Sequence, residues 1–193
     1  MTRIIGGIAG SIKLVSPAKP TRPTSDRIRE AIFNRLEAQD AISGLSVLDL
    51  YAGTGALALE AISRGAARAM MVEKDSKAAA VCIKNSLLVQ KAIEKAGESA
   101  GTKVVNKSVS SFLSSAAEYQ ATFDLVFIDP PYEISNSEIT ENLEQLLPLL
   151  KPEAIVVVER SSRSGEFAIP EMYQKENQKN YGDTEIFWFQ LIN

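Results

Sequence analysis

The sequence contains no histidine and a single cysteine, Cys82. Without histidine, Ser-His-Asp and Cys-His nucleophiles, histidine general bases and the usual zinc hydrolase sites are all excluded. One cysteine forms no intrachain disulfide and no cysteine-rich metal site, so we expect a reducing, cytoplasmic compartment and no bound metal. Cys82 falls among apolar positions of an expected helix, and we interpret it as a core residue.

Long hydrophobic runs are also absent. No stretch approaches the ~18 consecutive apolar residues that would span a membrane, and the first residues lack the apolar segment of a signal peptide. The 193 residues are 45% hydrophobic and 23% charged, which is typical of one globular domain with a core of its own.

Negative charge is scarce in the first part of the chain. Residues 1–36 carry seven basic and two acidic residues, a net charge of +5, although the whole chain has a net charge of −3. A basic segment on an acidic body suggests a local contact with a polyanion. On charge alone, a solvated helix face and tail would explain the pattern equally well.

Buried apolar runs alternate with helical patterns along most of the chain. We expect strands near 46–51, 69–73, 103–105, 123–129, 154–159, 173–179 and 185–191. Helices are expected near 26–36, 56–64, 76–96, 109–117 and 137–150, and a hairpin within 1–22. This order predicts an α/β protein with a parallel sheet covered on both faces, which binds ligands at the carboxyl ends of its strands.

A glycine-rich turn joins the first buried strand to its helix. It contains Gly53 and Gly55, and Asp49 lies just before it. Glycines adopt positive φ angles and let a ligand approach the backbone, and the helix N-terminus adds free N–H donors. Glu73 ends the next strand, where a carboxylate accepts the hydroxyl hydrogens of a ribose. The pattern indicates a nucleoside cofactor.

The turn alone leaves two cofactor classes open. Gly53, Gly55 and Ala58 also match the G-x-G-x-x-A fingerprint of dinucleotide-binding proteins. Asp49 favours S-adenosylmethionine over NAD(P). An acid facing the mouth of the pocket suits the cationic amino acid end of that cofactor, and it would repel a pyrophosphate.

The segment Asp129-Pro130-Pro131-Tyr132, called the proline corner below, directly follows the fourth expected strand. Two prolines remove N–H donors and stiffen the backbone, so the carbonyls and the Asp129 carboxylate become acceptors with a fixed aim. Such acceptors hold the hydrogens of an exocyclic amino group. The flat face of Tyr132 holds the ring in line with a methyl donor and tolerates growing positive charge. The corner therefore indicates methylation of an amino group.

These motifs resemble the RsmD family of class I methyltransferases, which methylate N2 of guanine 966 in bacterial 16S ribosomal RNA. The similarity extends over nearly the whole chain. The turn and the corner are shared with many methyltransferases, whereas Arg22–Glu30 and Tyr181–Thr184 are similar to this family in particular. Ser108 departs from the pattern, because many class I methyltransferases have an aspartate near that position that contacts the adenine amino group.

The resemblance implies a class I, Rossmann-like α/β fold. Its seven-stranded, mostly parallel sheet has helices on both faces, with a basic hairpin extension (1–23) before the methyltransferase domain (24–193). It also implies S-adenosylmethionine as cofactor, no metal and no membrane contact. The substrate would be 16S ribosomal RNA within an assembled or assembling small ribosomal subunit, and the protein would act as a monomer.

We expect the site residues to fall into three groups. The catalytic residues are Asp129, Pro130 and Tyr132. The cofactor-binding residues are Asp49, Tyr51, Gly53, Thr54, Gly55, Glu73, Lys74, Ser108 and Val109. The RNA-binding residues are Arg3, Lys13, Arg22, Arg27 and Arg29.

Other functions remain open at this point. A DNA adenine-N6 or protein glutamine methyltransferase would use a similar corner, although the basic segment favours nucleic acid over protein. An NAD(P) oxidoreductase is disfavoured by the lack of a Tyr-x-x-x-Lys pair and of histidine. A non-catalytic RNA-binding assembly factor would not need both the turn and the corner.

Overall fold

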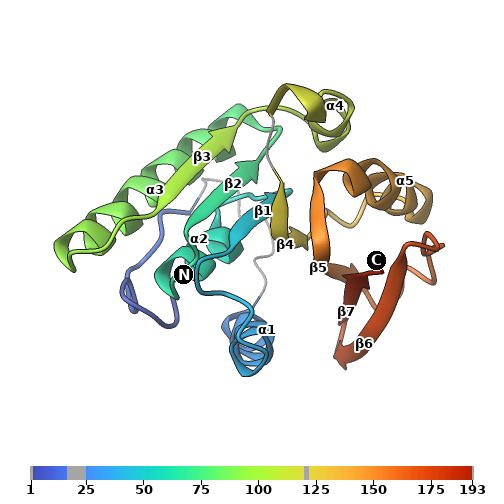
Figure 1. The fold of residues 1–193 in the computed structure, drawn as a ribbon, viewed down its shortest axis with the longest axis horizontal. Helices are drawn as coiled ribbons and strands as arrows, with labels where there is room; N and C mark the ends of the chain where they lie inside the picture. Colours follow the sequence, from blue (N-terminus) through green and yellow to red (C-terminus); the bar gives the residue numbers. More distant parts are fainter. Residues whose placement is uncertain (1, 17–24, 120–121, 193) are drawn as a thin grey trace.

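A computed structural model of the chain describes residues 2–16, 25–119 and 122–192. These residues form a seven-stranded sheet in the order β3-β2-β1-β4-β5-β7-β6 (Figure 1). Strands β1 to β5 pair in parallel, and β7 runs antiparallel to β5 and β6. The strands are β1 (Ser46–Leu50), β2 (Arg68–Val72), β3 (Gly101–Val105), β4 (Phe123–Ile128), β5 (Leu150–Ser161), β6 (Tyr173–Tyr181) and β7 (Thr184–Leu191).

Helices cover both faces of the sheet. They are α1 (Asp26–Ala38), α2 (Ala56–Ser63), α3 (Ser76–Lys95), α4 (Val109–Ser114) and α5 (Asn136–Leu146), with short 3-10 segments at Ala116–Tyr119 and Leu147–Leu149. The helix α1 begins where the sequence predicted, because the Ser25 side chain accepts a hydrogen bond from the Ile28 N–H. The predicted α/β class with a mostly parallel, seven-stranded sheet is confirmed.

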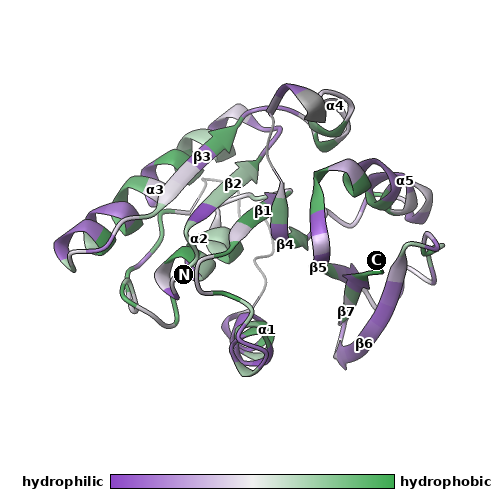
Figure 2. Ribbon diagram, viewed as in Figure 1, coloured by the Kyte–Doolittle hydropathy of each residue, from purple (hydrophilic) through white to green (hydrophobic). Residues whose placement is uncertain are grey.

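The alternation of side chains along the central strands divides the core in two. Val47 of β1 and Phe127 of β4 pack in one cluster with α1, α2 and α3. Their neighbours Leu48 and Ile128 point the other way and pack in a second cluster with α4 and α5. Both faces of the central strands are thus buried, whereas the edge strand β6 is hydrophilic along most of its length (Figure 2). Such near-continuous apolar strands are typical of parallel sheets.

The order of strands reverses between β1 and β4. The chain leaves β1 toward β2 and β3 on one side, then crosses back to β4 on the other side. Leu50 of β1 lies in register with Val72 of β2 and with Ile128 of β4. The residues that follow these three strands therefore leave the sheet at one edge, at the switch point where such sheets bind ligands.

The N-terminal segment packs onto α2 as part of the core. Backbone hydrogen bonds join Ile4 to Ile12 and Ser11, which confirms a hairpin between these residues. The carboxylate of Glu60 in α2 accepts hydrogen bonds from the N–H groups of Ile5 and Gly6 at 2.7 and 2.8 Å. The expected boundary at residue 23 lies outside the described residues, so the division of the chain into 1–23 and 24–193 stays a prediction.

Two elements near the C-terminus differ from the expectation. The helix expected to reach residue 150 ends at Leu146, because Pro148 lacks an N–H and the chain tightens into a 3-10 turn. The strand expected at 154–159 extends over Leu150–Ser161. Its last residues pair with β7, which the local apolar pattern of β5 does not indicate.

Candidate active site

The glycine turn, residues Tyr51 to Gly55, connects β1 to α2 at the switch-point edge (Figure 1). Tyr51, Gly53 and Gly55 all have positive φ angles, of 67°, 55° and 78°. The Ala52 N–H donates to the Val72 carbonyl at 2.9 Å, and the Gly55 N–H donates to the Ala52 carbonyl at 2.7 Å. The turn is therefore tight and tied to the end of β2.

Its two glycines serve different purposes. A Cβ added at Gly55 would lie 2.8 Å from Cys82 Sγ and 3.0 Å from Met71 Sδ, so only glycine lets α2 begin this close to α3. A Cβ added at Gly53 would meet no heavy atom within 4 Å. Gly53 therefore faces open space, and there is room for a ligand against this part of the turn.

Cys82 is buried in the core, as the sequence predicted. Its thiol donates a hydrogen bond to Met71 Sδ at 3.5 Å. Burial, together with the nearby charges of Asp49 and Glu73, raises the pKa of the thiol to about 12. The thiol stays protonated at neutral pH and is not an available nucleophile.

Glu73 follows β2 and holds the turn. One of its oxygens accepts the Gly53 N–H at 2.9 Å and the other accepts the Asp75 N–H at 2.8 Å. A carboxylate offers about four lone-pair sites, so acceptor capacity remains for a ribose diol. The amide of Asn106 donates to the Glu73 and Lys74 carbonyls at 2.8 and 3.1 Å and fixes this strand end. We did not predict the role of Asn106, which depends on a contact across 33 residues.

Asp49 lies deeper than we expected. Side chains alternate along β1, so Asp49 points to the α2 face, where it is 1% exposed and does not face an open pocket mouth. Its carboxylate accepts the Ala58 N–H of α2 at 3.2 Å. Burial raises the pKa of Asp49 to about 8; the Ala58 N–H opposes this rise, and the charges of Asp129 and Glu73 add to it. Asp129 and Glu73 thus both act on Asp49 at the switch point.

The proline corner follows β4 beside the turn. Pro130 is buried, Asp129 is partly buried and Tyr132 is 55% exposed. Arg160 of β5 holds the loop that follows the corner. Its guanidinium donates to the Ile134 carbonyl at 2.8 Å and to Asn136 Oδ1 at 3.0 Å. The tyrosine ring is free to stack on a partner, while the backbone next to it is held in place.

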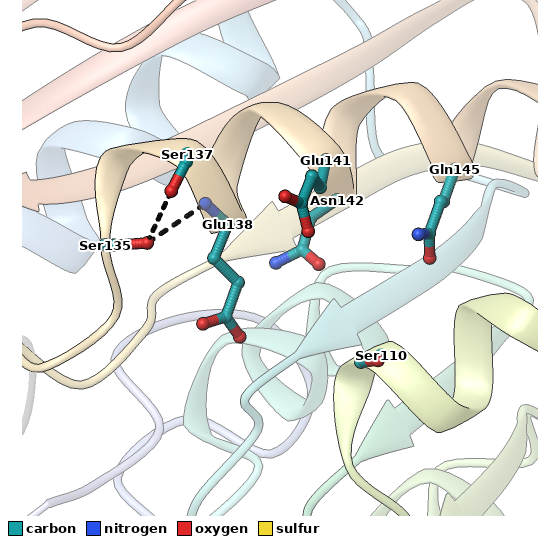
Figure 3. A pocket seen from close by; sticks show the side chains of 7 residues that line it. All are labelled: Ser110, Ser135, Ser137, Glu138, Glu141, Asn142 and Gln145. Carbon is teal, nitrogen blue, oxygen red and sulfur yellow. Dashed lines mark hydrogen bonds between the residues drawn. The ribbon is translucent and has the colours of Figure 1, made fainter.

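A polar pocket of about 370 Å³ lies between α4 and α5. Its lining residues are Ser110, Ser135, Ser137, Glu138, Glu141, Asn142 and Gln145 (Figure 3). Asn142 also donates to the Tyr51 hydroxyl at 2.7 Å, so the pocket adjoins the glycine turn. Burial raises the pKa of Tyr51 to about 12. Tyr51 therefore stays neutral and links the turn to α5.

The remaining cofactor-binding candidates lie around the same edge. Lys74 is exposed beside Glu73, and Val109 is buried at the start of α4. The Ser108 hydroxyl caps α4 by accepting the Ser111 N–H at 3.1 Å, and it donates to the Ser111 hydroxyl at 2.9 Å. Ser108 thus has a structural role, and its contact with an adenine stays a prediction.

Thr54 belongs to an unexpected connection. The Asn85 side chain of α3, which is fully buried, donates to the Thr54 and Val15 carbonyls at 3.0 Å each. Its oxygen accepts the Val15 N–H at 2.7 Å. One amide therefore joins the N-terminal segment, the glycine turn and α3.

The five RNA-binding candidates do not form one group. Arg3, Lys13 and Arg27 are exposed, and Arg3 also lies 3.3 Å from Asp26. Arg22 lies outside the described residues. The prediction for Arg29 is wrong, because its side chain is fully buried.

Arg29 instead joins three parts of the fold. Its guanidinium donates to the Arg3 carbonyl and to Asp26 Oδ1, both at 2.7 Å, and it lies 3.9 Å from Glu60. A buried arginine of this kind connects the N-terminal hairpin to α1 and α2, and RNA cannot reach it without unfolding of the region.

In residues 2–16, 25–119 and 122–192, no group of three or more Cys, Asp or Glu side chains is arranged to hold a metal ion. No helix among the same residues is long and apolar enough to cross a membrane.

The strand order, with the turn and the corner at its switch point, defines the fold of the class I methyltransferases. The same fold occurs in the rRNA methyltransferase AviRa of Streptomyces viridochromogenes, with a TM-score of 0.69 over 96% of this chain and 90% of that chain. The two are 15% identical, which shows the fold alone.

The chain belongs to the family described as conserved hypothetical protein 95, whose model matches residues 2–190. It is 37% identical to ribosomal RNA small subunit methyltransferase D of Escherichia coli over 189 residues, which are 97% of this chain and 89% of the relative. The solved structure of Escherichia coli YhhF is 34% identical, with a TM-score of 0.81 over 98% of this chain and 97% of that chain. The resemblance to the RsmD family is confirmed.

Proposed function

We propose that the protein transfers a methyl group from S-adenosylmethionine to the exocyclic N2 of a guanine, at position 966, in 16S ribosomal RNA. One observation carries the proposal: the register of Leu50 with Ile128 brings the glycine turn and the proline corner together at the switch point. The name of the Escherichia coli relative supports the choice of small-subunit ribosomal RNA as substrate.

The residues of the turn fit this cofactor. Open space beside Gly53 accommodates the nucleoside, and the remaining lone pairs of Glu73 suit the ribose hydroxyls. Asp49, with a pKa of about 8, is mostly protonated at neutral pH in the free protein. A cationic ligand next to the turn would favour the ionised form of Asp49. The resulting attraction between opposite charges would strengthen binding of the ligand. A pyrophosphate would gain nothing from an ionised Asp49 and would lie near the charges of Glu73 and Asp129, so the electrostatics disfavour NAD(P).

The residues of the corner fit an amino acceptor. The bound cofactor supplies a methyl group on a positively charged sulfur. Asp129 and the Pro130 carbonyl accept hydrogen bonds from the guanine amino group, and Tyr132 stacks on the ring. With the amino group held in this way, the N2 electron pair would form the new N–C bond as the S–C bond breaks toward sulfur, and one N2 proton would be lost to water.

The guanine must leave its stack to reach the corner, at a cost of a few kcal/mol. The exposed ring of Tyr132 provides a new stacking partner that offsets part of this cost. We propose that the substrate is presented on the small ribosomal subunit, and that the protein acts as a cytoplasmic monomer. Of the N-terminal set, we propose as RNA contacts Arg3, Lys13 and Arg27, whose side chains are exposed, and Arg22, which lies outside the described residues.

Transfer of labelled methyl to small-subunit particles that lack the modification, followed by nucleoside analysis, tests the function. We expect the label in N2-methylguanosine at one position. Label in N6-methyladenosine or in a ribosomal protein would contradict the choice of acceptor. Binding of RNA without any transfer would favour the assembly-factor alternative.

A further inference from the structure

A row of four lysines runs along the outer face of α3. Lys77, Lys84, Lys91 and Lys95, called the lysine stripe below, are all exposed. At 3.6 residues per turn they fall within about 40° of one another and extend over about 27 Å. They lie opposite the buried positions of the helix, which include Ala79, Cys82, Val89 and Ile93.

Helix stability explains one lysine of the stripe, because Lys95 lies in the last turn, where the helix dipole favours a positive charge, but it gives no reason for the other three. Lys77 lies in the first turn, which contains no acidic residue and where the helix dipole disfavours a positive charge. Lys91 and Lys95 are like charges four residues apart, which is mildly destabilising. Throughout the described residues, none of the four lysines makes an ion pair. The position of Lys77 and the Lys91–Lys95 pair each cost a few tenths of a kcal/mol of helix stability.

The stripe also stands out against the charge of the whole chain. The helix has four lysines and one acid, Glu94, in a protein with a net charge of −3. The Asn85 amide holds Val15 of the N-terminal segment beside the same helix. In Figure 1 this segment lies next to α3. The N-terminal segment therefore packs against α3 through the buried Asn85, while the stripe faces outward from the same helix.

We propose that the lysine stripe binds the phosphodiester backbone of the RNA substrate. The proposal rests on the proposed function and names a partner surface that the N-terminal residues alone do not provide. A lysine ammonium is a compact charge that contacts phosphate without reading sequence. The stripe would therefore add affinity and orientation, and the proline corner would select the base.

The position of the stripe agrees with this role. Lys77 follows Glu73 by four residues, so the stripe begins near the cofactor end of the site. The helix then leads away from the carboxyl edge of the sheet toward Lys95 (Figure 1). RNA on the stripe would be held beside the site without blocking the corner.

The salt dependence of RNA binding tests the proposal. The variant Lys84→Gln/Lys91→Gln removes two stripe charges far from the cofactor site. The control Lys175→Gln/Lys179→Gln removes two exposed lysines from the edge strand β6. Affinity for a 16S ribosomal RNA fragment is measured against KCl concentration for both variants and the parent, together with S-adenosylhomocysteine affinity and melting temperature.

Each phosphate contact contributes about 0.7–0.9 to the slope of log K against log salt. We expect the magnitude of this slope to be smaller by about 1.4–1.8 in the stripe variant than in the parent. The slope of the β6 control should stay at the parental value. Cofactor affinity and melting temperature should not change. A parental slope in the stripe variant overturns the proposal. So does an unchanged slope on RNA combined with weaker binding to small-subunit particles, because that result assigns the stripe to an acidic protein surface.

The experiments distinguish a failure of the proposed function from a failure of the lysine-stripe proposal. Methyl transfer to guanine by the parent with an unchanged slope in the variant overturns the stripe alone. A reduced slope in the variant, with no transfer by the parent, supports the stripe and overturns the proposed function.

Discussion

The glycine turn and the proline corner lie side by side at one edge of the sheet, yet they are built differently. The turn is closed by hydrogen bonds from Gly53 to Glu73 and from Ala58 to Asp49, and its second glycine packs against Cys82. The corner instead presents the exposed ring of Tyr132, and Arg160 holds the loop that follows it. Changes in the turn should therefore affect stability and cofactor binding, whereas changes in the corner should chiefly affect turnover.

Substitutions in the proline corner should have the largest effect, which is on kcat. Asp129→Ala and Tyr132→Ala should each lower kcat on the order of 10²-fold, because each removes a group aligned with the transition state. The melting temperature and S-adenosylhomocysteine affinity should stay near parental values in Tyr132→Ala, whose ring is exposed, whereas Asp129→Ala also removes a charge that acts on Asp49. Single-turnover assays on unmodified small subunits, beside thermal melts, measure both quantities.

Asp129→Asn refines this expectation. It keeps one acceptor oxygen, so an aligned acceptor predicts partial activity for the Asn variant and almost none for the Ala variant. An obligate proton-abstracting base predicts that the two are equally inactive. Near-parental turnover in Asp129→Ala would refute both roles.

Stability of the turn should come next in size, and its two glycines form a matched pair. Gly55→Ala adds a Cβ at φ 78° and within 2.8 Å of Cys82 Sγ, so we expect it to lower the free energy of unfolding by about 2–4 kcal/mol. Gly53→Ala meets no atom within 4 Å and has only the cost of its φ of 55°, about 1 kcal/mol. Urea unfolding of both variants measures the difference.

The two glycines should rank the other way in ligand binding, because Gly53 faces the open side of the turn. Among the variants that fold, Gly53→Ala should weaken S-adenosylhomocysteine binding more than Gly55→Ala does, although it destabilises the fold less. Equal losses of stability in the two variants would mean that packing against Cys82 does not determine the need for Gly55.

The sequence predicted the elements of the turn and the corner because their signals are local. Buried apolar runs stop at Gly53, at Glu73 and at Pro130, and these breaks mark strand ends. The burial of Arg29 was also within reach of the sequence. Arg29 precedes Ile32 by three residues and Phe33 by four, so the helical period places it on the buried face.

Other parts of the site could not be predicted from pattern. Asn85 binds Val15 across 70 residues, and Glu60 binds Ile5 across 55. Arg160 reaches Ile134 across 26 residues. A polar residue that satisfies distant backbone groups leaves no periodic signal, because its partner is set by the packing of whole elements.

Cofactor affinity should show a smaller effect. Glu73→Ala should weaken S-adenosylhomocysteine binding by about 1–3 kcal/mol, the scale of a hydrogen bond to a charged group. Glu73→Gln keeps one acceptor and should lose less. Isothermal titration calorimetry measures both, with Glu171→Ala as an exposed control away from the turn. Parental affinity in Glu73→Ala would show that this carboxylate does not hold the ribose.

The most specific effect concerns the proton on Asp49. Its pKa rises from the ordinary value of 3.8 to about 8 in the folded protein, chiefly because the carboxyl is buried. Between these two values the unfolded chain has released a proton that the folded protein keeps. The folded state binds more protons in this window, so its stability should fall as pH rises from about 4 to about 8. Asp49→Asn has no proton to lose and should remove this part of the pH dependence.

Cofactor binding should reverse the effect, because the cationic amino group of S-adenosylhomocysteine favours the ionised form of Asp49 and lowers its pKa. Binding near pH 7 should therefore release close to one proton, and affinity should rise with pH until about 8 and then level off. Titrations in buffers of different ionisation enthalpy measure the proton release directly, and Asp49→Asn should show less of it. Proton release that is the same in parent and variant would assign the proton to another group. It would also leave the turn without an electrostatic preference for a cationic ligand, and so remove one of the contrasts with the corner beside it.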